Sequence, residues 1–267
     1  MQQSESLFGQ TKLRPLQFEG SGRPWRRGPA SPVIWPNEVH VWKIDLSAPW
    51  SSENQETLSN DERVRAKRFR FHTDGDRFIA ARSSLRTILA RYLWTKPAEL
   101  KFGVNPFGKP HLVGGLDKLG LRFNLSHSHE MALLAVARNR DVGVDIEFIR
   151  RDFATDDVAQ RFFSRSEVDQ LGSIAAELKT EAFFNCWTRK EAYIKARGEG
   201  LSSPLDQFDV SLAPNAPAAL LANRRDRGEV SRWSFQALSP APEYAAALAV
   251  KAGFSRMCLW NFNQPAL

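Results

Sequence analysis

The sequence predicts an α+β fold made of two similar halves, each with a small antiparallel-rich sheet packed on one long helix. Alternation of apolar and polar residues marks strands such as Glu38–Leu46, because successive side chains of a strand point to opposite faces. Two long stretches have helical periodicity, one ending before Pro97 and one at Gly198. The order strand, long helix and further strands occurs twice, which favours two layered halves, although no sequence repeat proves a duplication.

The first half is expected over residues 32–138, after a flexible tail over residues 1–31. The tail is rich in Gly, Pro and Arg and offers few side chains that could pack. Leu58–Glu62 contains a helix start with acids in its first turn, and a longer helix is expected to begin at Asp74 or Asp76. The apolar stripe of that helix comprises Phe78, Ala81, Leu85, Ile88, Leu89 and Tyr92.

A loop rich in Gly and Pro, Phe102–Pro110, leads to three strand-like runs at residues 121–125, 131–137 and 141–146. Short turns separate these runs, which predicts an antiparallel meander. The second half is expected over residues 139–267. Its helices are predicted at about 157–171 and 180–197, and its strands at 208–212, 233–237 and 245–250.

The composition is that of an ordinary globular protein, with 42% hydrophobic and 25% charged residues over 267 positions. No apolar run is long enough for a transmembrane helix, and the N-terminus lacks the apolar segment of a secretory signal. The two cysteines, Cys186 and Cys258, form neither a disulfide framework nor a zinc motif. A cytoplasmic protein is therefore expected, with Cys186 buried in the core.

The net charge of +7 is concentrated in one segment, because residues 61–101 hold eleven Lys and Arg against five Asp and Glu. Such an excess is compatible with nucleic acid, a membrane surface or any acidic partner. No helix-turn-helix, zinc or RNA-recognition signature accompanies it. Neither nucleic acid nor a membrane is expected as a partner, and an acidic protein is preferred.

Two short runs carry the candidate chemistry, and the first is Gly143–Glu147. Asp145 and Glu147 are two residues apart in a predicted strand, so both side chains project from one face. A pair of carboxylates so placed can share one hard cation. Taken alone, the pair could equally be ordinary surface acids.

The second run is Trp187–Lys195, which has helical character. Trp187, Glu191 and Lys195 are spaced four residues apart and share one stripe of the helix. Glu191 would be a third carboxylate beside lysines, and Mg²⁺ binds few carboxylates and shares its ligands with substrate phosphates. The bland alternative for Glu191 and Lys195 is a surface ion pair, and Trp187 is expected to pack in the core beneath this helix.

In combination with further motifs, these runs resemble the 4′-phosphopantetheinyl transferases of the large, single-chain type that activate peptide and polyketide synthetases. The resemblance covers about residues 60–260 and implies two similar α/β halves with coenzyme A in the cleft between them. Its motifs are Lys67-Arg68-Phe69, Asp76-Arg77, Ala81-Arg82, Gly108-Lys109-Pro110, Phe123–Ser128, Gly143–Glu147, Arg161–Ser164, Trp187–Lys195, Gly200-Leu201-Ser202 and Pro204-Leu205.

The resemblance implies a reaction in which the phosphopantetheine arm of coenzyme A is transferred to a serine of an acyl or peptidyl carrier protein. Adenosine 3′,5′-bisphosphate is the leaving group. Asp145, Glu147 and Glu191 would hold Mg²⁺, or Mn²⁺. Glu191 would also help to deprotonate the serine, directly or through water, and Lys195 would contact the transferring phosphate and protonate the leaving oxygen.

The same resemblance implies a set of contacts to coenzyme A. His127 would meet its 3′-phosphate or a nearby phosphate, and Lys190 would supply a secondary electrostatic contact. Arg65 stands where the family usually carries lysine, and its neighbour Glu62 stands where some members carry another lysine, so Arg63 is an alternative. The implied coenzyme A contacts are Arg65, Arg82, Gly108, Lys109, Pro110, Ser126, His127, Lys190 and Lys195.

The enzyme is expected to be a monomer that acts on acidic apo carrier proteins. Three other functions compete with this interpretation. One is a metal-dependent phosphohydrolase of a nucleotide-like substrate that uses the same acids, and another is a basic nucleic-acid-binding protein. The third is a scaffold that binds coenzyme A without turnover, which the presence of all three acids and Lys195 disfavours.

Overall fold

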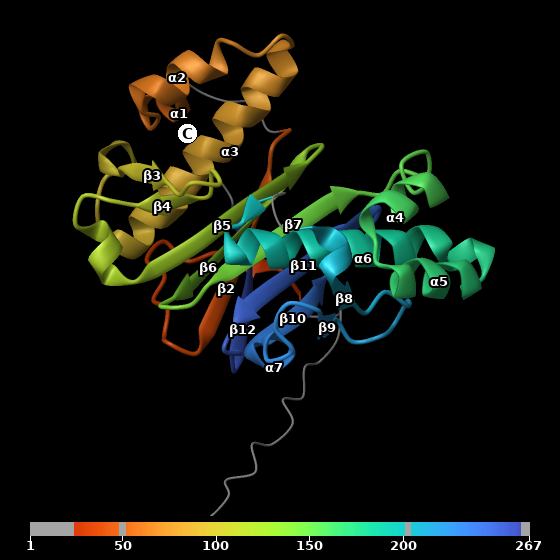
Figure 1. The fold of residues 1–267 in the computed structure, drawn as a ribbon. Coiled ribbons are helices and arrows are strands. Elements are labelled where there is room, and N and C mark those ends of the chain that lie inside the picture. Colours follow the sequence, from red (N-terminus) through yellow and green to blue (C-terminus); the bar gives the residue numbers. More distant parts are fainter. Residues whose placement is uncertain (1–23, 48–51, 201–203, 263–267) are drawn as a thin grey trace, which may run out of the picture.

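The computed structural model describes residues 24–47, 52–200 and 204–262. Two sheets and two long helices form the central layers of this part of the chain (Figure 1). No helix within these ranges is both long and apolar enough to cross a lipid bilayer.

The first sheet has five strands in the order β1-β12-β2-β6-β5. β2 pairs in parallel with β12 and antiparallel with β6, and β6 pairs antiparallel with β5. Helix α3 (His72–Leu93) covers one face of this sheet, and its apolar side chains share a core with Trp42, Ile44 and Leu134. The strands are β1 (Arg26–Arg27), β2 (Glu38–Asp45), β5 (Leu121–Ser128), β6 (Met131–Arg138) and β12 (Arg256–Phe262).

The second sheet has three antiparallel strands in the order β10-β11-β7. Helix α6 (Ala176–Arg197) packs on β7 and β11, as Figure 1 shows. It ends at Gly198, whose left-handed backbone (φ 71°) closes the helix as expected. The strands are β7 (Val142–Phe148), β10 (Trp233–Leu238) and β11 (Tyr244–Lys251).

A third core cluster joins the two sheets. Val39 and Val41 of β2 contribute to it together with Val144 and Ile146 of β7. Because alternate residues of a strand face opposite ways, the neighbouring residues of β2 face α3, and those of β7 face α6. The molecule is therefore layered as helix, sheet, sheet, helix, which confirms the predicted α+β fold with two similar halves.

Shorter elements flank these layers. They are α1 (Ser52–Glu56), α2 (Asn60–Ala66), β3 (Phe102–Val104), β4 (Pro110–Leu112), α4 (Asp156–Phe162), α5 (Arg165–Ser173), β8 (Phe208–Val210), β9 (Leu220–Asn223) and α7 (Glu229–Arg232), with 3₁₀ turns at Pro97–Glu99, Leu116–Leu119 and Leu205–Gln207.

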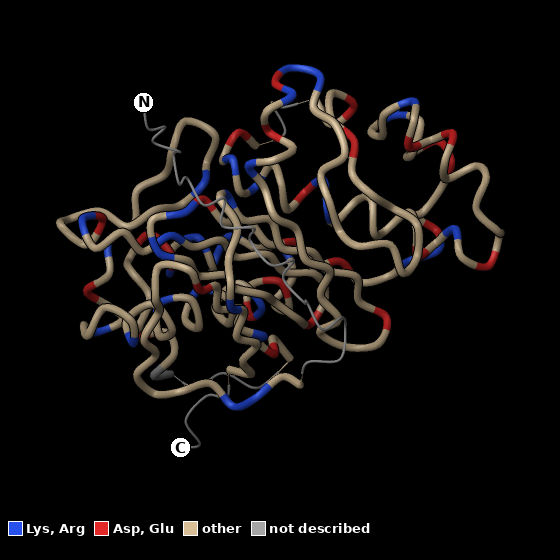
Figure 2. Tube along the Cα trace, turned by 90° about the horizontal axis from the view of Figure 1, so that it is seen from below, with Lys and Arg blue, Asp and Glu red and all other residues tan. Residues whose placement is uncertain are grey.

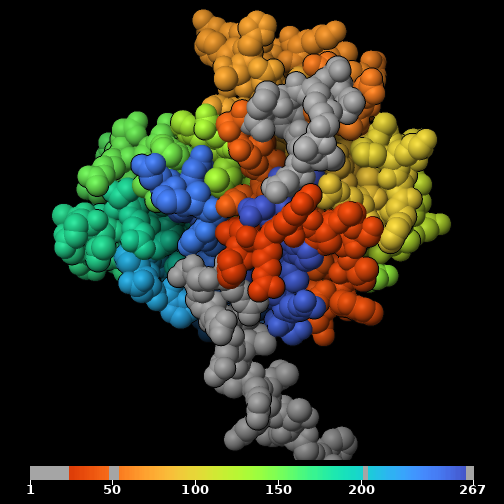
Figure 3. All heavy atoms as spheres, turned by 180° about the vertical axis from the view of Figure 1, so that it is seen from behind, coloured from red at the N-terminus to blue at the C-terminus, as the bar shows by residue number. Residues whose placement is uncertain are grey.

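The predicted boundary of the N-terminal tail is wrong in part. Residues 1–23 lie outside the described part of the chain, but Arg26–Arg27 pairs with β12 as β1. The indole of Trp25 donates a hydrogen bond to the Ser239 carbonyl oxygen (3.2 Å), and the Gly28 amide donates to the Asn261 carbonyl (3.0 Å). Figure 3 shows this red segment against the blue C-terminal strands. Order therefore begins before residue 31.

The predicted division into residues 32–138 and 139–267 also needs a correction. β12 comes from the end of the chain, yet it lies in the first sheet between β1 and β2. The predicted meander is wrong at its third strand, because β7 pairs with β11 and not with β6 or β5. The second half therefore lends one strand to the first sheet.

Candidate active site

The first acidic run lies on β7, between the two sheets and α6. Val142, Val144 and Ile146 pack in the core between the sheets, so the alternate residues Gly143, Asp145 and Glu147 face α6. A Cβ atom at Gly143 would lie 2.1 Å from the carbonyl oxygen of Ala192 and 2.3 Å from the amide nitrogen of Ala196. The glycine thus allows α6 to approach the backbone of β7 closely.

This approach brings Lys195 of α6 onto Asp145 of β7. The Lys195 ammonium donates to Asp145 Oδ1 (2.5 Å) and to Ser126 Oγ (2.9 Å). Ser126 in turn donates to the same Asp145 oxygen (2.9 Å). Asp145 is 1% exposed at its side chain and Lys195 is 30% exposed, so the pair reaches from the interior to the surface.

Glu191 and Glu147 add their charges to this pair. Burial, then the charges of Asp145 and Glu147, raise the pKa of Glu191 to about 7 against the opposing charge of Lys195. Burial and the charge of Asp145 also raise the pKa of Glu147. Burial alone would lower the pKa of Lys195, but the charge and hydrogen bond of Asp145, together with the charges of Glu191 and Glu147, outweigh burial and raise it. The three predicted acids and Lys195 therefore form one electrostatic cluster.

A divalent cation fits this cluster by its chemistry. Asp145 Oδ2 is buried and has no hydrogen-bond partner, so an oxygen ligand is left open beside two further carboxylates. Hard cations such as Mg²⁺ prefer oxygen ligands of this kind. The cluster is not arranged as a finished ligand set, since no group of three His, Cys, Asp or Glu side chains in the described ranges already has metal-binding geometry.

Strand β5 contributes side chains to the site in addition to β7 and α6. Ser126 is buried, and its hydroxyl links Asp145 to Lys195. It therefore lies beside the acids, and its predicted contact with coenzyme A stays a prediction. Ser128, which is not among the predicted site residues, donates a hydrogen bond to Glu147 Oε2 (2.9 Å). The alternation of the run Phe123–Ser128 could have indicated Ser128, because it shares a strand face with Ser126.

His127 lies beside this cluster with its ring accessible to solvent. Partial loss of hydration around the ring lowers the pKa of His127, and the positive charges of Lys195 and Arg77 lower it further. Arg77, near the start of α3, is a further cation beside His127 and was not among the predicted site residues. Its guanidinium lies 3.6 Å from the Glu130 carboxylate. The positive charges of Arg77 and Lys195 next to His127 favour an anion at this place.

The Gly108-Lys109-Pro110 turn lies against the C-terminal end of α6, next to Ala196 and Gly198. Gly108 has φ 85°, a left-handed conformation that glycine tolerates. The Lys109 ammonium donates to the carbonyl oxygens of Val142 (3.2 Å) and Ala196 (2.8 Å). Burial lowers the pKa of Lys109 to about 8. The Lys109 ammonium therefore braces the two halves, and its nucleotide contact stays a prediction. Lys109 and Pro110 line a cavity of about 200 Å³.

Two arginines predicted to bind phosphate have protein partners of their own. Arg82 is paired with the buried carboxylate of Glu62, which also accepts a hydrogen bond from Arg86 (2.6 Å). Glu62 therefore anchors α2 to α3 instead of leaving Arg82 for a ligand. Arg65 is exposed on α2, and its guanidinium lies 5.2 Å from the ring centre of Phe78. A phosphate role for Arg65 stays a prediction.

The predicted role of Lys190 is wrong. Its side chain is fully buried and forms an ion pair with Glu167 (2.7 Å). The ammonium also donates to the carbonyl oxygens of Leu205 and Phe208, at 2.7 Å each. Lys190 therefore stabilises the packing of α5 and α6 and is not available to coenzyme A.

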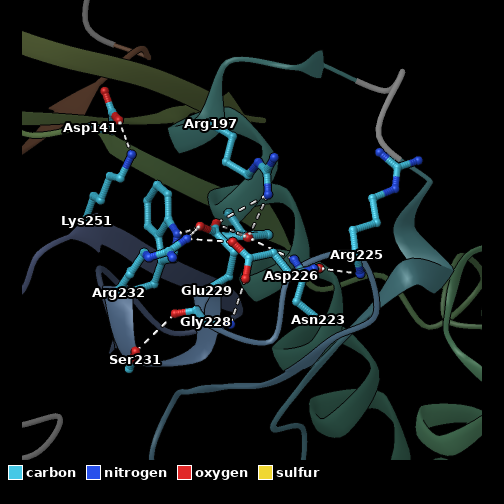
Figure 4. A network of polar contacts seen from close by, with 12 residues as sticks. Asp141, Arg197, Asn223, Arg225, Asp226, Gly228, Glu229, Ser231, Arg232 and Lys251 are labelled. Carbon is cyan, nitrogen blue, oxygen red and sulfur yellow. Dashed lines mark hydrogen bonds and ion pairs between the residues drawn. The ribbon is translucent and has the colours of Figure 1, made fainter.

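Other residues of α6 hold the helix in place. Trp187 packs against Phe153, Phe162 and Phe183, and Cys186 is buried, as predicted for both. At the end of the helix, Tyr193 and Arg197 donate to one oxygen of Glu229 on α7, at 2.8 and 3.3 Å. Figure 4 shows Arg197 and Arg232 converging on this carboxylate.

Comparison with known proteins assigns this geometry to a family. Residues 46–139 match the family model of the N-terminal part of 4′-phosphopantetheinyl transferase, and residues 141–249 match that of the 4′-phosphopantetheinyl transferase superfamily. The 4′-phosphopantetheinyl transferase HetI of Nostoc is 40% identical over 232 residues, which cover 86% of this chain and 94% of that protein. Sfp of Bacillus subtilis, another 4′-phosphopantetheinyl transferase, is 30% identical over 178 residues, which cover 65% and 77%.

The chain therefore belongs to the 4′-phosphopantetheinyl transferase superfamily. It is an enzyme of the large, single-chain type, as the motifs predicted. Among solved structures, the holo-[acyl-carrier-protein] synthase of Thermotoga maritima is 23% identical with a TM-score of 0.34 and covers 42% of this chain and 63% of its own. That likeness is too low to add to the assignment.

Proposed function

We propose that this enzyme transfers the 4′-phosphopantetheine group of coenzyme A to a serine of an acyl or peptidyl carrier protein in a Mg²⁺-dependent reaction. The observation that carries the proposal is the cluster of Asp145, Glu147, Glu191 and Lys195 at the junction of the two halves in a member of this family. Mn²⁺ could replace Mg²⁺, because both bind carboxylate oxygens.

In this reaction the serine oxygen forms a bond to the phosphorus that carries pantetheine. The bond from that phosphorus to the oxygen of the adenosine 3′,5′-bisphosphate leaving group breaks. Glu191 takes the serine proton, directly or through water. The pKa of about 7 for Glu191 suits an acid–base group near neutral pH.

The Lys195 ammonium has a raised pKa and stays charged, so it stabilises negative charge on the phosphate and on the leaving oxygen. His127 and Arg77, which lie close enough for the charge of Arg77 to lower the pKa of His127, would bind further phosphate groups of coenzyme A. Asp145, Glu147 and Glu191 would hold the cation. When bound, Mg²⁺ supplies charge neutralisation on the pyrophosphate.

An acidic carrier protein fits the exposed charge near α2. Arg63, Arg65, Lys67, Arg68 and Arg70 are all exposed at the end of α2 and in the turn before α3. Elsewhere both signs of charge alternate along the chain, as Figure 2 shows. Such a local excess increases the association rate of an acidic partner more than its affinity.

The test is incubation with coenzyme A, Mg²⁺ and several apo carrier proteins, followed by intact mass measurement. Addition of one phosphopantetheine group to the carrier supports the proposal, and no addition to any carrier contradicts it. A phosphohydrolase would instead release product from coenzyme A without a carrier protein. A nucleic-acid-binding protein would bind random duplex DNA with strong salt dependence.

Two accompanying proposals concern the enzyme in the cell. We propose that it lies in the cytoplasm and acts as a monomer, since the first half of the same chain supplies Ser126 and Ser128 to the site. Cell fractionation tests the first proposal. Sedimentation of the purified enzyme in the presence of coenzyme A tests the second, and a stable dimer would contradict it.

A further inference from the structure

The free edges of the two sheets meet between β5 and β7. β5 is the last strand of the first sheet, and β7 is the last strand of the second. The two strands lie in contact, yet within the described residues no β-ladder joins them. The backbone groups on this edge of β7 therefore need other partners, because unpaired buried N–H and C=O groups are costly.

Side chains of β5 supply partners for two of the backbone amides on this edge of β7. Asn124 Oδ1 accepts a hydrogen bond from the Val144 amide (2.8 Å), and Ser128 Oγ accepts one from the Phe148 amide (3.0 Å). Both partners share one face of β5 with Ser126, which donates to Asp145. This set of contacts, which we call the polar seam (Asn124, Ser126 and Ser128), replaces a ladder between the sheets.

The polar seam also orients the two acids of β7. Ser126 donates to one oxygen of Asp145, and Asp145 Oδ2 stays without a partner. Ser128 donates to Oε2 of Glu147 while it accepts from the amide of the next residue, Phe148. The single hydroxyl of Ser128 is thus tied at once to the backbone of β7 and to the carboxylate that this backbone carries.

We propose that Ser128 is a positioning residue that sets the orientation of the Glu147 carboxylate for cation binding. The proposal rests on the metal dependence proposed above. Hydrogen bonds to ligating carboxylates fix their orientation, and loss of such a partner typically weakens metal affinity ~10–100-fold. A serine with a purely structural role would contribute to folding and leave metal affinity unchanged.

Mn²⁺ titration of the enzyme at saturating coenzyme A, followed by electron paramagnetic resonance of free Mn²⁺, separates the two roles. Ser128→Ala should weaken Mn²⁺ binding ~10-fold or more, whereas Ser128→Thr keeps the hydroxyl and should bind close to wild type. Ser211→Ala is the matched control. Like Ser128, Ser211 accepts a hydrogen bond from a backbone amide, that of Ala219. It donates to the Pro217 carbonyl oxygen and contacts Arg189 instead of the acids.

The expected result is a loss of Mn²⁺ affinity in Ser128→Ala alone, with the Mg²⁺ concentration for half-maximal transfer shifted in parallel. Wild-type affinity in Ser128→Ala, or an equal loss in Ser211→Ala, would overturn the proposal. So would a Ser128→Thr protein as weak as Ser128→Ala. A wild-type enzyme that transfers phosphopantetheine but binds no Mn²⁺ would instead refute the metal dependence itself, and the role of Ser128 with it.

Discussion

A methyl group added at Gly143 is expected to disable the enzyme with a moderate loss of stability. The Cβ atom of Gly143→Ala would lie 2.1 Å from the Ala192 carbonyl oxygen and 2.3 Å from the Ala196 amide nitrogen. Both contacts are to backbone atoms of α6, so no side-chain rotation relieves them. β7 and α6 must separate by about 1 Å, and overpacking of this kind typically costs about 1–3 kcal/mol.

The separation acts directly on the proposed catalytic cluster of Asp145, Glu147, Glu191 and Lys195. Asp145 lies two residues after Gly143 on β7, and Lys195 adjoins Ala196 on α6, so the 2.5 Å contact between Asp145 and Lys195 crosses the widened interface. A misplacement of about 1 Å can cost roughly 100-fold in rate. We therefore expect transfer to fall by about that factor while the protein remains folded.

The assay combines urea unfolding with the rate of carrier modification measured by intact mass. Gly172→Ala on α5 is the control, because nothing lies within 4 Å of its added Cβ. That change should leave the rate alone and raise stability by up to about 1 kcal/mol, as alanine favours a helix. A Gly143→Ala enzyme with wild-type rate and stability would refute the close packing of β7 on α6.

Three further predictions follow from single features of the structure. Glu191→Gln keeps the size of the side chain and removes its charge, so the transfer rate should fall ~10²–10⁴-fold with the fold retained, and a near-wild-type rate would exclude Glu191 as base. Burial lowers the pKa of His40 to about 4, below the ordinary 6.5. The unfolded state then binds more protons between these values, so stability should decrease by up to about 3 kcal/mol as the pH falls through this window. His40→Gln should flatten that dependence in urea unfolding at several pH values, and an unchanged slope would contradict the assignment. Removal of residues 2–22 should leave the transfer activity within a few-fold of wild type. Removal of residues 2–28 also deletes β1 and the Trp25 contact and should lower the midpoint of thermal unfolding. Equal midpoints for the two truncated proteins would show that β1 contributes nothing to stability.

Local periodicity was sufficient for much of the site. The two-residue spacing of Asp145 and Glu147 placed both on the α6 face of β7, and the four-residue spacing of Glu191 and Lys195 placed both on the β7 face of α6. The same rule could have excluded Lys190. One residue of a helix turns the side chain by about 100°, so Lys190 faces away from the stripe of Glu191 and into the core.

Long-range pairing was not readable from the chain. Short turns made β5, β6 and β7 look like one meander, but β7 lies against β11, about a hundred positions later, and leaves its other edge to the polar seam. Likewise, β12 joins the first sheet although it belongs to the end of the chain. The alternation of apolar and polar residues tells which residues share a face of a strand. It does not tell which other strand pairs with that strand.

The sequence by itself therefore determined the α+β class, the family, the long helices and the acids with Lys195, because these depend on spacing within one element or on contiguous motifs. Only the tertiary structure decided where charged side chains find partners. Arg82 turns to Glu62, Lys109 to two backbone carbonyls and Lys190 to Glu167. A buried charge needs a partner from whichever element packs against it, and that element is known only once the chain has folded.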